Sequence, residues 1–264
     1  MSAGWLEVVR EGLKVPGLLV EVYGDLARPG VRQVGLALET VLGLGNTLLW
    51  PVALANERAR IALVKNLQAY RERMVNVPEK DVIQVAPEIG VPIAEKLAYV
   101  NDIGLTSLYV ELLAKASTVT SVAKAHPSFV NVINNLSPDE ALLLQVFMSR
   151  DHLPFARVDL IHGDTGQGYQ VLKDVVIPEN VAQTLAYPEN VSAYFSNLAG
   201  LGLVQLDHDG QLKDEPQYAE LESLWLKQLE GSAPPNSNKK VSATRGTIDV
   251  TAFGRQFISA CHEA

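Results

Sequence analysis

The chain of 264 residues is 47% hydrophobic and 20% charged, which is the composition of a soluble globular protein large enough to bury a sizeable core. Its formal net charge of −8 and pI of about 5.2 argue against general nucleic-acid binding, because phosphate contacts require an excess of Lys and Arg. The single cysteine, Cys261, excludes an internal disulfide framework and a cysteine-rich zinc site. The first residues lack the basic leader and apolar core of a secretory signal, so we expect a cytoplasmic protein.

Residues 34–56 form the most apolar stretch of the chain and approach the length of a membrane span. Glu39, Asn46, Thr47 and the helix-breaking Pro51 interrupt the stretch, so two interpretations stay open. It is either a buried hairpin helix in a bundle or a segment that acts on a membrane or a partner. In the second interpretation the contact residues are large apolar side chains, namely Leu36, Leu42, Leu44, Leu48 and Trp50.

The next run, residues 57–74, has the spacing of an amphipathic helix. One stripe of it is apolar and is expected to face the core; it comprises Leu63, Leu67, Tyr70 and Met74. The opposite side carries Arg58, Lys65 and Arg73. Such a helix is either a surface helix with solvated charges or a contact for anionic lipid or a partner, which would make the protein peripheral to a membrane.

The rest of the first half also predicts helices, at residues 87–100 and 102–117 and after His126. Ser137 opens a further helix, which runs to about residue 149. The start signal there is strong, because Ser137 suits the N-cap, Pro138 the first position and Glu140 the third. We therefore expect a helical domain over residues 1–150.

The second half changes character and alternates short strands with short helices. Strands are predicted at residues 157–162 and 169–177, flanking the turn GDTGQG, and again at 203–206 and 247–251. Helices are predicted after Pro178, after Pro188, at about 217–229 and after Thr251, and residues 231–245 read as a mobile polar loop. The fold class is therefore mainly α, with an N-terminal helical bundle or hairpin followed by a winged-helix-like α+β domain at 151–264 that carries a helical insertion.

Several stretches in this order are similar to a known family. They are Tyr23-Gly24-Asp25-Leu26, residues 35–54, residues 92–97 and residues 112–114 and, most specifically, His126-Pro127-Ser128-Phe129 and Leu136-Ser137-Pro138-Asp139-Glu140-Ala141. Together they resemble the Abi-alpha family of bacterial abortive-infection proteins, which act against phage. The resemblance implies a cytoplasmic, helical phage-defence protein and offers no catalytic residues to carry over. It implies structural roles for the motif residues His126, Pro127, Phe129, Ser137, Pro138, Asp139 and Glu140.

No residue pattern in the chain indicates a reaction centre. The five histidines lack the i, i+4 spacing of a zinc protease helix, and GDTGQG lacks the Lys-Ser/Thr ending of a phosphate loop. His126 could be a general base or a switch, but we favour a structural imidazole that ties a helix entry to a backbone carbonyl. Cys261 shares a helical stripe with Phe253 and Phe257, which predicts a buried thiol. We expect no enzyme, no cofactor and no metal site.

The winged-helix expectation raises the question of DNA binding. The segment in the recognition position, residues 188–199, has no Lys or Arg and includes Glu189. Asn190, Ser192, Tyr194 and Asn197 could donate hydrogen bonds but not the electrostatic attraction. The sequence therefore predicts a non-enzymatic defence protein that binds a protein partner, a phage component or a membrane, with self-association left open. A DNA-binding transcription regulator ranks second, and an unseen hydrolase or nuclease third.

Overall fold

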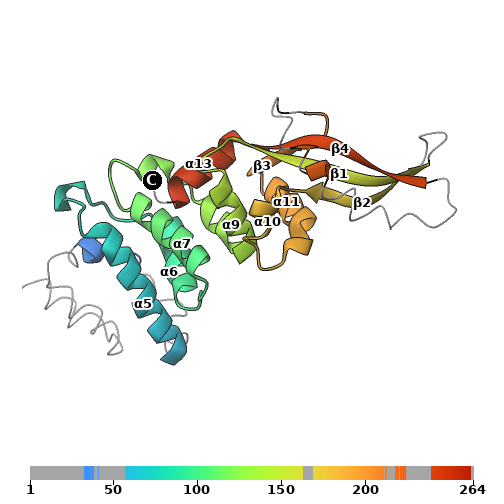
Figure 1. Cartoon of the computed structure of the whole chain (residues 1–264). Helices are drawn as coiled ribbons and strands as arrows, with labels where there is room; N and C mark the ends of the chain where they lie inside the picture. The colour runs from blue at the N-terminus through green and yellow to red at the C-terminus, as the bar shows by residue number, and fades with distance from the viewer. Residues whose placement is uncertain are drawn as a thin grey trace, which may run out of the picture. The chain divides into compact units, whose positions relative to one another are not determined.

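A computed structural model describes residues 33–38, 41, 57–162, 169–210, 212, 218–219, 221–223 and 239–262 (Figure 1). The protein is helix-rich and has a four-stranded antiparallel sheet in its C-terminal half. The chain divides into two compact units, which we call the helical unit (Met1–Asn135 with Ser259–Ala264) and the sheet unit (Leu136–Ile258). The helix that opens at Ser137 belongs to the sheet unit and not to the N-terminal helical domain in which it was expected.

The helical unit contains α5 (Glu57–Met74), α6 (Pro87–Leu97), α7 (Ile103–Ala116) and α8 (Ser128–Asn134), with short 3-10 turns η2 (Glu79–Asp81) and η3 (Val122–Lys124). Local signals fix the helix starts: Pro87 occupies the first turn of α6, and the Asp102 carboxylate accepts a hydrogen bond from Leu105 N at 2.9 Å to cap α7. α5 packs against both α6 and α7 (Figure 1).

Two buried polar groups fasten α5 to its neighbours. Asn66 donates its side-chain amide to the carbonyls of Leu97 at 2.8 Å and Val100 at 3.2 Å, which satisfies acceptors at the end of α6. The Tyr70 hydroxyl lies 2.5 Å from Ser117 Oγ, which in turn donates to a carbonyl of α7. Burial raises the pKa of the Tyr70 hydroxyl well above its ordinary value, so this group acts as a neutral hydrogen-bonding link.

The sheet unit orders its strands β2-β1-β4-β3, and every neighbouring pair is antiparallel. The strands are β1 (His152–His162), β2 (Tyr169–Val176), β3 (Val204–Asp207) and β4 (Lys239–Val250). The accompanying helices are α9 (Pro138–Val146), α10 (Glu179–Ala182), α11 (Val191–Gly200), which follows the 3-10 turn η4 (Pro188–Asn190), and α13 (Ala252–Cys261). The last residues of α13, from Ser259 on, belong to the helical unit. α11 packs against β2, β3 and α9.

β1 is buried on both of its faces. Leu153 and Phe155 are fully buried on one face, while Ala156 and Val158 on the other pack against the cluster that contains Tyr218. β4 has Gly246 opposite Phe155, and a Cβ at that glycine would lie 2.4 Å from the Phe155 ring. The glycine therefore makes room for the largest side chain at this level of the sheet.

Two sequence-based boundaries in this unit are wrong. β1 begins at His152 rather than at residue 157, and residues 239–245, which were expected in a mobile loop, belong to β4. The reason is non-local, since β1 and β4 pair continuously from His152 and Asp249 to His162 and Lys239. Residues 231–238 of the expected loop lie outside the described residues.

Candidate functional site

α5 divides its side chains between a buried and an exposed face, as its periodicity predicts. The apolar stripe is confirmed, because Leu63, Leu67, Tyr70 and Met74 are all buried. On the opposite side, Ile61 is 59% exposed and Val64 is 43% exposed, although both are large aliphatic residues. An apolar face that the fold leaves in water on an otherwise ordered helix marks a candidate contact surface.

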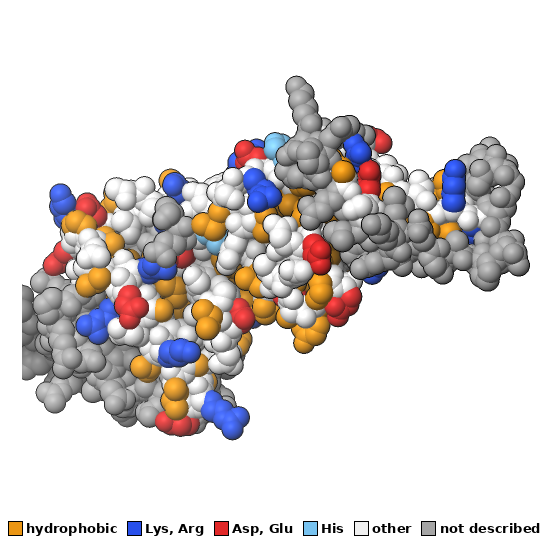
Figure 2. All heavy atoms as spheres, in the orientation of Figure 1, with side chains coloured by type: hydrophobic (Ala, Val, Ile, Leu, Met, Phe, Trp, Pro, Cys, Tyr) orange, Lys and Arg blue, Asp and Glu red, His pale blue; other side chains and the backbone are white. Residues whose placement is uncertain are grey.

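The exposed apolar residues of α5 and of the position just after it lie in one line. Ile61, Val64 and Val75 are spaced i, i+3 and i+14, with the polar Gln68 between them at i+7. Val75 lies just past the helix end and still donates its amide to Arg71 O at 3.0 Å. We call Ile61, Val64 and Val75 the α5 strip. Basic side chains border it on both sides, with the exposed Arg58 and Lys65 on one side and the half-buried Arg71 on the other. Figure 2 shows hydrophobic and basic side chains intermixed over the helical unit.

The third basic residue predicted for this surface, Arg73, has another role. Its Nε pairs with Glu111 Oε1 of α7, whose carboxylate is buried. A buried carboxylate needs a charged partner, so Arg73 serves the packing of α5 on α7. Arg58 and Lys65 were expected on this surface, whereas Ile61, Val64 and Arg71 were not, although their spacing opposite the core stripe could have indicated them.

Most of the described residues in the apolar stretch that precedes α5 belong to the core. Val34, Ala37, Leu38 and Val41 are buried, and Val85 N donates to Ala37 O at 2.9 Å. Gly90 of α6 allows the close approach, because a Cβ there would lie 2.3 Å from Val41 Cγ2. This part of the stretch is therefore packed inside the helical unit.

The predicted contact residues of the same stretch are only partly visible. Leu36 is 36% exposed. Four others lie outside the described residues, namely Leu42, Leu44, Leu48 and Trp50. No helix within the described ranges combines the length and the apolar character needed to cross a bilayer.

The first family-like motif, at residues 126–129, makes a local turn. Ser128 N donates to His126 Nδ1 at 3.1 Å, and Ser128 Oγ lies 2.6 Å from the same nitrogen. The His126 ring also lies against Phe129, which is fully buried. His126 and Pro127 are exposed. The imidazole thus helps to cap α8 through a backbone amide rather than the carbonyl that the sequence analysis expected, because free amides are the groups at a helix start.

The second motif, Ser137 to Glu140, forms the predicted capping box at the start of α9. Ser137 Oγ accepts from Glu140 N at 3.3 Å, Glu140 Oε2 accepts from Ser137 N at 2.6 Å, and Pro138 occupies the first turn. The second carboxylate oxygen of Glu140 accepts from Asn197 Nδ2 of α11 at 2.7 Å. The buried Glu140 therefore caps the start of α9 with one carboxylate oxygen and binds α11 with the other.

Asp139 makes the denser contact between the same elements. Oδ1 accepts from Ala186 N, and Oδ2 accepts from Tyr187 N and from the Tyr194 hydroxyl, each at 2.9 Å. Burial alone would raise the pKa of Asp139, but these three hydrogen bonds outweigh burial and lower it. Asp139 is an ionised anchor that fixes the loop before α11.

These anchors bear on the DNA-binding alternative. The four side chains that the sequence offered as hydrogen-bond donors to DNA all make intramolecular contacts in the sheet unit. Tyr194 and Asn197 bind Asp139 and Glu140, Ser192 Oγ lies 3.1 Å from Val175 N, and the exposed Asn190 bonds to Tyr194. The outward positions of α11 are Ala193, Ser196 and Gly200. Side chains that already hold intramolecular bonds would lose them on turning to a base.

A family model described as "Abortive infection alpha" matches residues 62–261 of the chain. The protein belongs to the Abortive infection alpha family. No curated protein matches it. The chain is also similar to a solved structure of an uncharacterized protein from the hydrocarbon-degrading marine bacterium Alcanivorax borkumensis SK2, with 21% identity, a TM-score of 0.34, and coverage of 50% of this chain and 90% of that chain.

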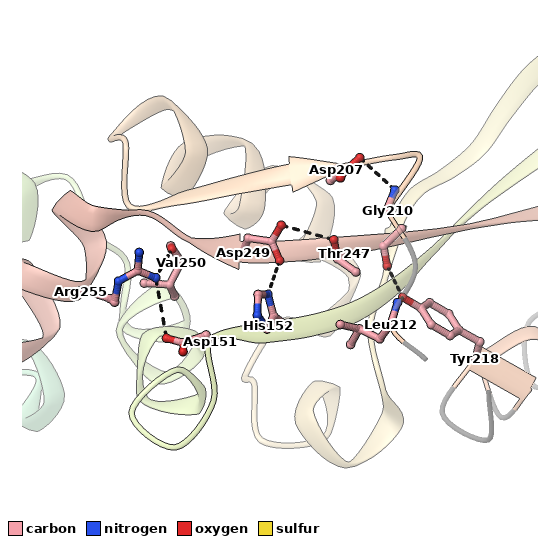
Figure 3. A network of polar contacts seen from close by, with 11 residues as sticks. Asp151, His152, Asp207, Gly210, Leu212, Tyr218, Thr247, Asp249, Val250 and Arg255 are labelled. Carbon is pink, nitrogen blue, oxygen red and sulfur yellow. Dashed lines mark hydrogen bonds and ion pairs between the residues drawn. The ribbon is translucent and has the colours of Figure 1, made fainter. Parts of the chain in front are cut away.

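The sheet of this Abortive infection alpha protein carries a His–Asp pair that the sequence analysis did not find (Figure 3). His152 of β1 stands opposite Asp249 of β4, with Nδ1 and Oδ1 2.6 Å apart, and Thr247 Oγ1 donates to Asp249 Oδ2 at 3.4 Å. In a catalytic triad the histidine of such a pair also contacts a nucleophile. The His152–Asp249 pair joins β1 to β4, and no serine, threonine or cysteine of the described residues hydrogen-bonds to His152.

Further hydrogen bonds hold this end of the sheet together. The Asp207 carboxylate accepts from Gly210 N (Figure 3) and from Asp209 N, which closes the turn after β3. Tyr218 donates its hydroxyl to Gly246 O at 3.0 Å. Among the described residues, no three His, Cys, Asp or Glu side chains are grouped so as to hold a metal ion. No local sequence pattern predicts the contact between His152 and Asp249, because only the pairing of β1 with β4 brings the two residues together.

The helical unit of this family member buries the one thiol. Cys261 is fully buried, which confirms the expectation from its helical stripe. Burial and, to a smaller extent, the charge of Glu111 raise the pKa of the Cys261 thiol well above its ordinary value. The nucleophilic form of cysteine is the thiolate, so this environment disfavours covalent chemistry. The adjacent His262 is also buried, and burial lowers its pKa to about 4.

Proposed function

We propose that this chain is a non-enzymatic phage-defence protein of the abortive-infection type, which acts from the cytoplasm by binding a partner surface through the exposed side of α5. Membership of the Abortive infection alpha family supports the defence role. The observation that carries the binding role is the α5 strip, in which three exposed aliphatic residues lie between basic borders on a helix whose other face is core.

We further propose that the sheet unit is a winged-helix-like scaffold rather than a DNA reader. Its order of α9, β1, α10, α11, β3 and β4, with β4 paired between β1 and β3, supports this topology, and β2 is an addition at the edge. The internal hydrogen bonds of Tyr194 and Asn197, and the absence of Lys and Arg from residues 188–199, favour a structural role over base readout.

A phage-plating assay tests the proposal. Bacteria that express the wild-type chain should give fewer plaques than bacteria without it, and the double variant Ile61→Asp/Val64→Asp should restore plaque formation. Ile103→Asp is the matched control, because Ile103 is 82% exposed in the same unit but lies on α7. It should keep protection, and thermal melting should show that all three chains fold alike.

A second variant separates the binding proposal from a hidden enzyme. His152→Ala removes the imidazole of the His–Asp pair, which is largely exposed. We expect this variant to protect as well as the wild type. If a folded His152→Ala chain loses protection while Ile61→Asp/Val64→Asp retains it, the functional centre is on the sheet and the proposal is wrong.

A further inference from the structure

We propose that the α5 strip binds the surface of an anionic lipid bilayer, with α5 lying parallel to the membrane plane; this inference rests on the proposed function and names its partner. The buried stripe of α5 contains Leu63, Tyr70 and Met74, so the helix presents the strip without leaving the fold. The strip shares its exposed face of α5 with Gln68 and Glu72, which are hydrogen-bonded to each other. A fluid interface accepts the branched aliphatic side chains of the strip without a complementary pocket.

Charge supplies the second argument. The sequence of α5 contains five basic residues and two acidic ones, for a net charge of +3, in a chain whose total is −8. The remainder of the chain therefore carries −11, so α5 differs in the sign of its net charge from the rest of the chain, and an anionic surface would attract α5. Arg73 pairs with the buried Glu111, so it belongs to the packing of α5 on α7, whereas the exposed Lys65 and the half-buried Arg71 lie beside the strip.

The placement of these borders matches an interfacial helix. Lys and Arg side chains beside an apolar strip can reach outward to the headgroups while their aliphatic stems stay with the strip. Each basic residue near an anionic membrane surface raises binding about fivefold, which corresponds to ~1 kcal/mol. A reversal such as Lys65→Glu should therefore weaken binding about 25-fold, since it removes one attraction and adds one repulsion.

The test is co-sedimentation of the full chain with vesicles of phosphatidylcholine alone or of phosphatidylcholine mixed with phosphatidylglycerol. We expect binding to the mixed vesicles that falls as salt rises, a loss of about 25-fold for Lys65→Glu, and a comparable or larger loss for Ile61→Asp. Ile103→Asp, the same chemical change on another exposed aliphatic residue, should bind like the wild type. Equal binding to both vesicle types, or equal losses for Ile103→Asp and Ile61→Asp, would contradict the inference.

Infected cells supply the condition in which a defence protein works. The wild-type chain should be found in the membrane fraction of phage-infected cells, and the Lys65→Glu variant should be depleted from that fraction. If the wild type binds no vesicles and stays out of that fraction, the lipid inference is overturned. The proposed function still stands in that case if Ile61→Asp/Val64→Asp abolishes plaque protection, because the strip would then contact a protein. If the Ile61→Asp/Val64→Asp double variant protects cells from phage as well as the wild type does, the proposed function fails as well.

Discussion

Replacing Asp139 by Asn is the sharpest test of the anchor between α9 and α11. The carboxylate is 3% exposed and accepts three hydrogen bonds, from Ala186 N, Tyr187 N and the Tyr194 hydroxyl. An Asn side chain keeps one acceptor oxygen and turns an NH₂ donor toward at least one of these donors. A hydrogen bond to a charged group contributes about 1.5–3 kcal/mol, and an unsatisfied buried donor costs about 1–3 kcal/mol. We therefore expect the free energy of unfolding to fall by about 3–5 kcal/mol.

The measurement is urea-induced unfolding followed by circular dichroism, with Tyr194→Phe as the partial control. That variant removes one of the three donors and leaves the two backbone bonds, so it should cost about 1–2 kcal/mol. The pH dependence gives a second readout. Because the pKa of Asp139 is lowered by folding, its stabilisation is present above the ordinary pKa and is lost as pH falls through the folded value. Asp139→Asn should remove this acid-dependent loss; a variant as stable as wild type at neutral pH would refute the reasoning.

Three further changes test the packing of the helical unit, each by urea unfolding of the full chain. Folding lowers the pKa of His262 to about 4, so as pH falls below ~6.5 the unfolded state takes up a proton that the folded state does not bind. The free energy of unfolding should therefore fall by about 2 kcal/mol between pH 7 and pH 5. His262→Gln should remove most of this decrease. Gly90→Ala should lower the free energy of unfolding by about 1–3 kcal/mol, despite the better helix propensity of alanine, because the new Cβ would meet Val41. In a chain that already carries Val41→Ala, Gly90→Ala should be less destabilising; if the effects of the two substitutions simply add, the contact is contradicted. Asn66→Ala should cost about 1–3 kcal/mol because two carbonyls lose their donor, whereas the exposed Asn101→Ala should cost little.

Residue patterns along the chain correctly predicted those structural features that depend only on neighbouring residues. The core stripe of α5 follows from its periodicity, and the start of α9 follows from Ser137, Pro138 and Glu140 acting within one turn. The burial of Val41 could not be decided in the same way. An apolar run is compatible with core or with membrane until its cover is known, and the cover here is Gly90, which lies far along the chain.

Non-local pairing explains what the sequence analysis missed. Residues 239–245 are polar enough to read as a loop, and only the register with β1 makes them a strand. The same register brings His152 to Asp249 across 97 residues, and the tertiary fold turns Asp139 toward the amides of Ala186 and Tyr187. Such acceptor and donor partners are chosen by topology, so residue spacing along the chain carries no record of them.

The helical unit is closed by a piece of chain that comes from the far end of the sequence. Ser259–Ala264 belongs to this unit, and Ala260 and Cys261 are fully buried parts of its core. During translation, the first 135 residues therefore leave the ribosome without the side chains that complete their packing, and they must wait for the entire sheet unit to be synthesised. A nascent chain stalled before residue 259 would hold an unfinished helical unit, so the protein reaches its working form only late in its own synthesis.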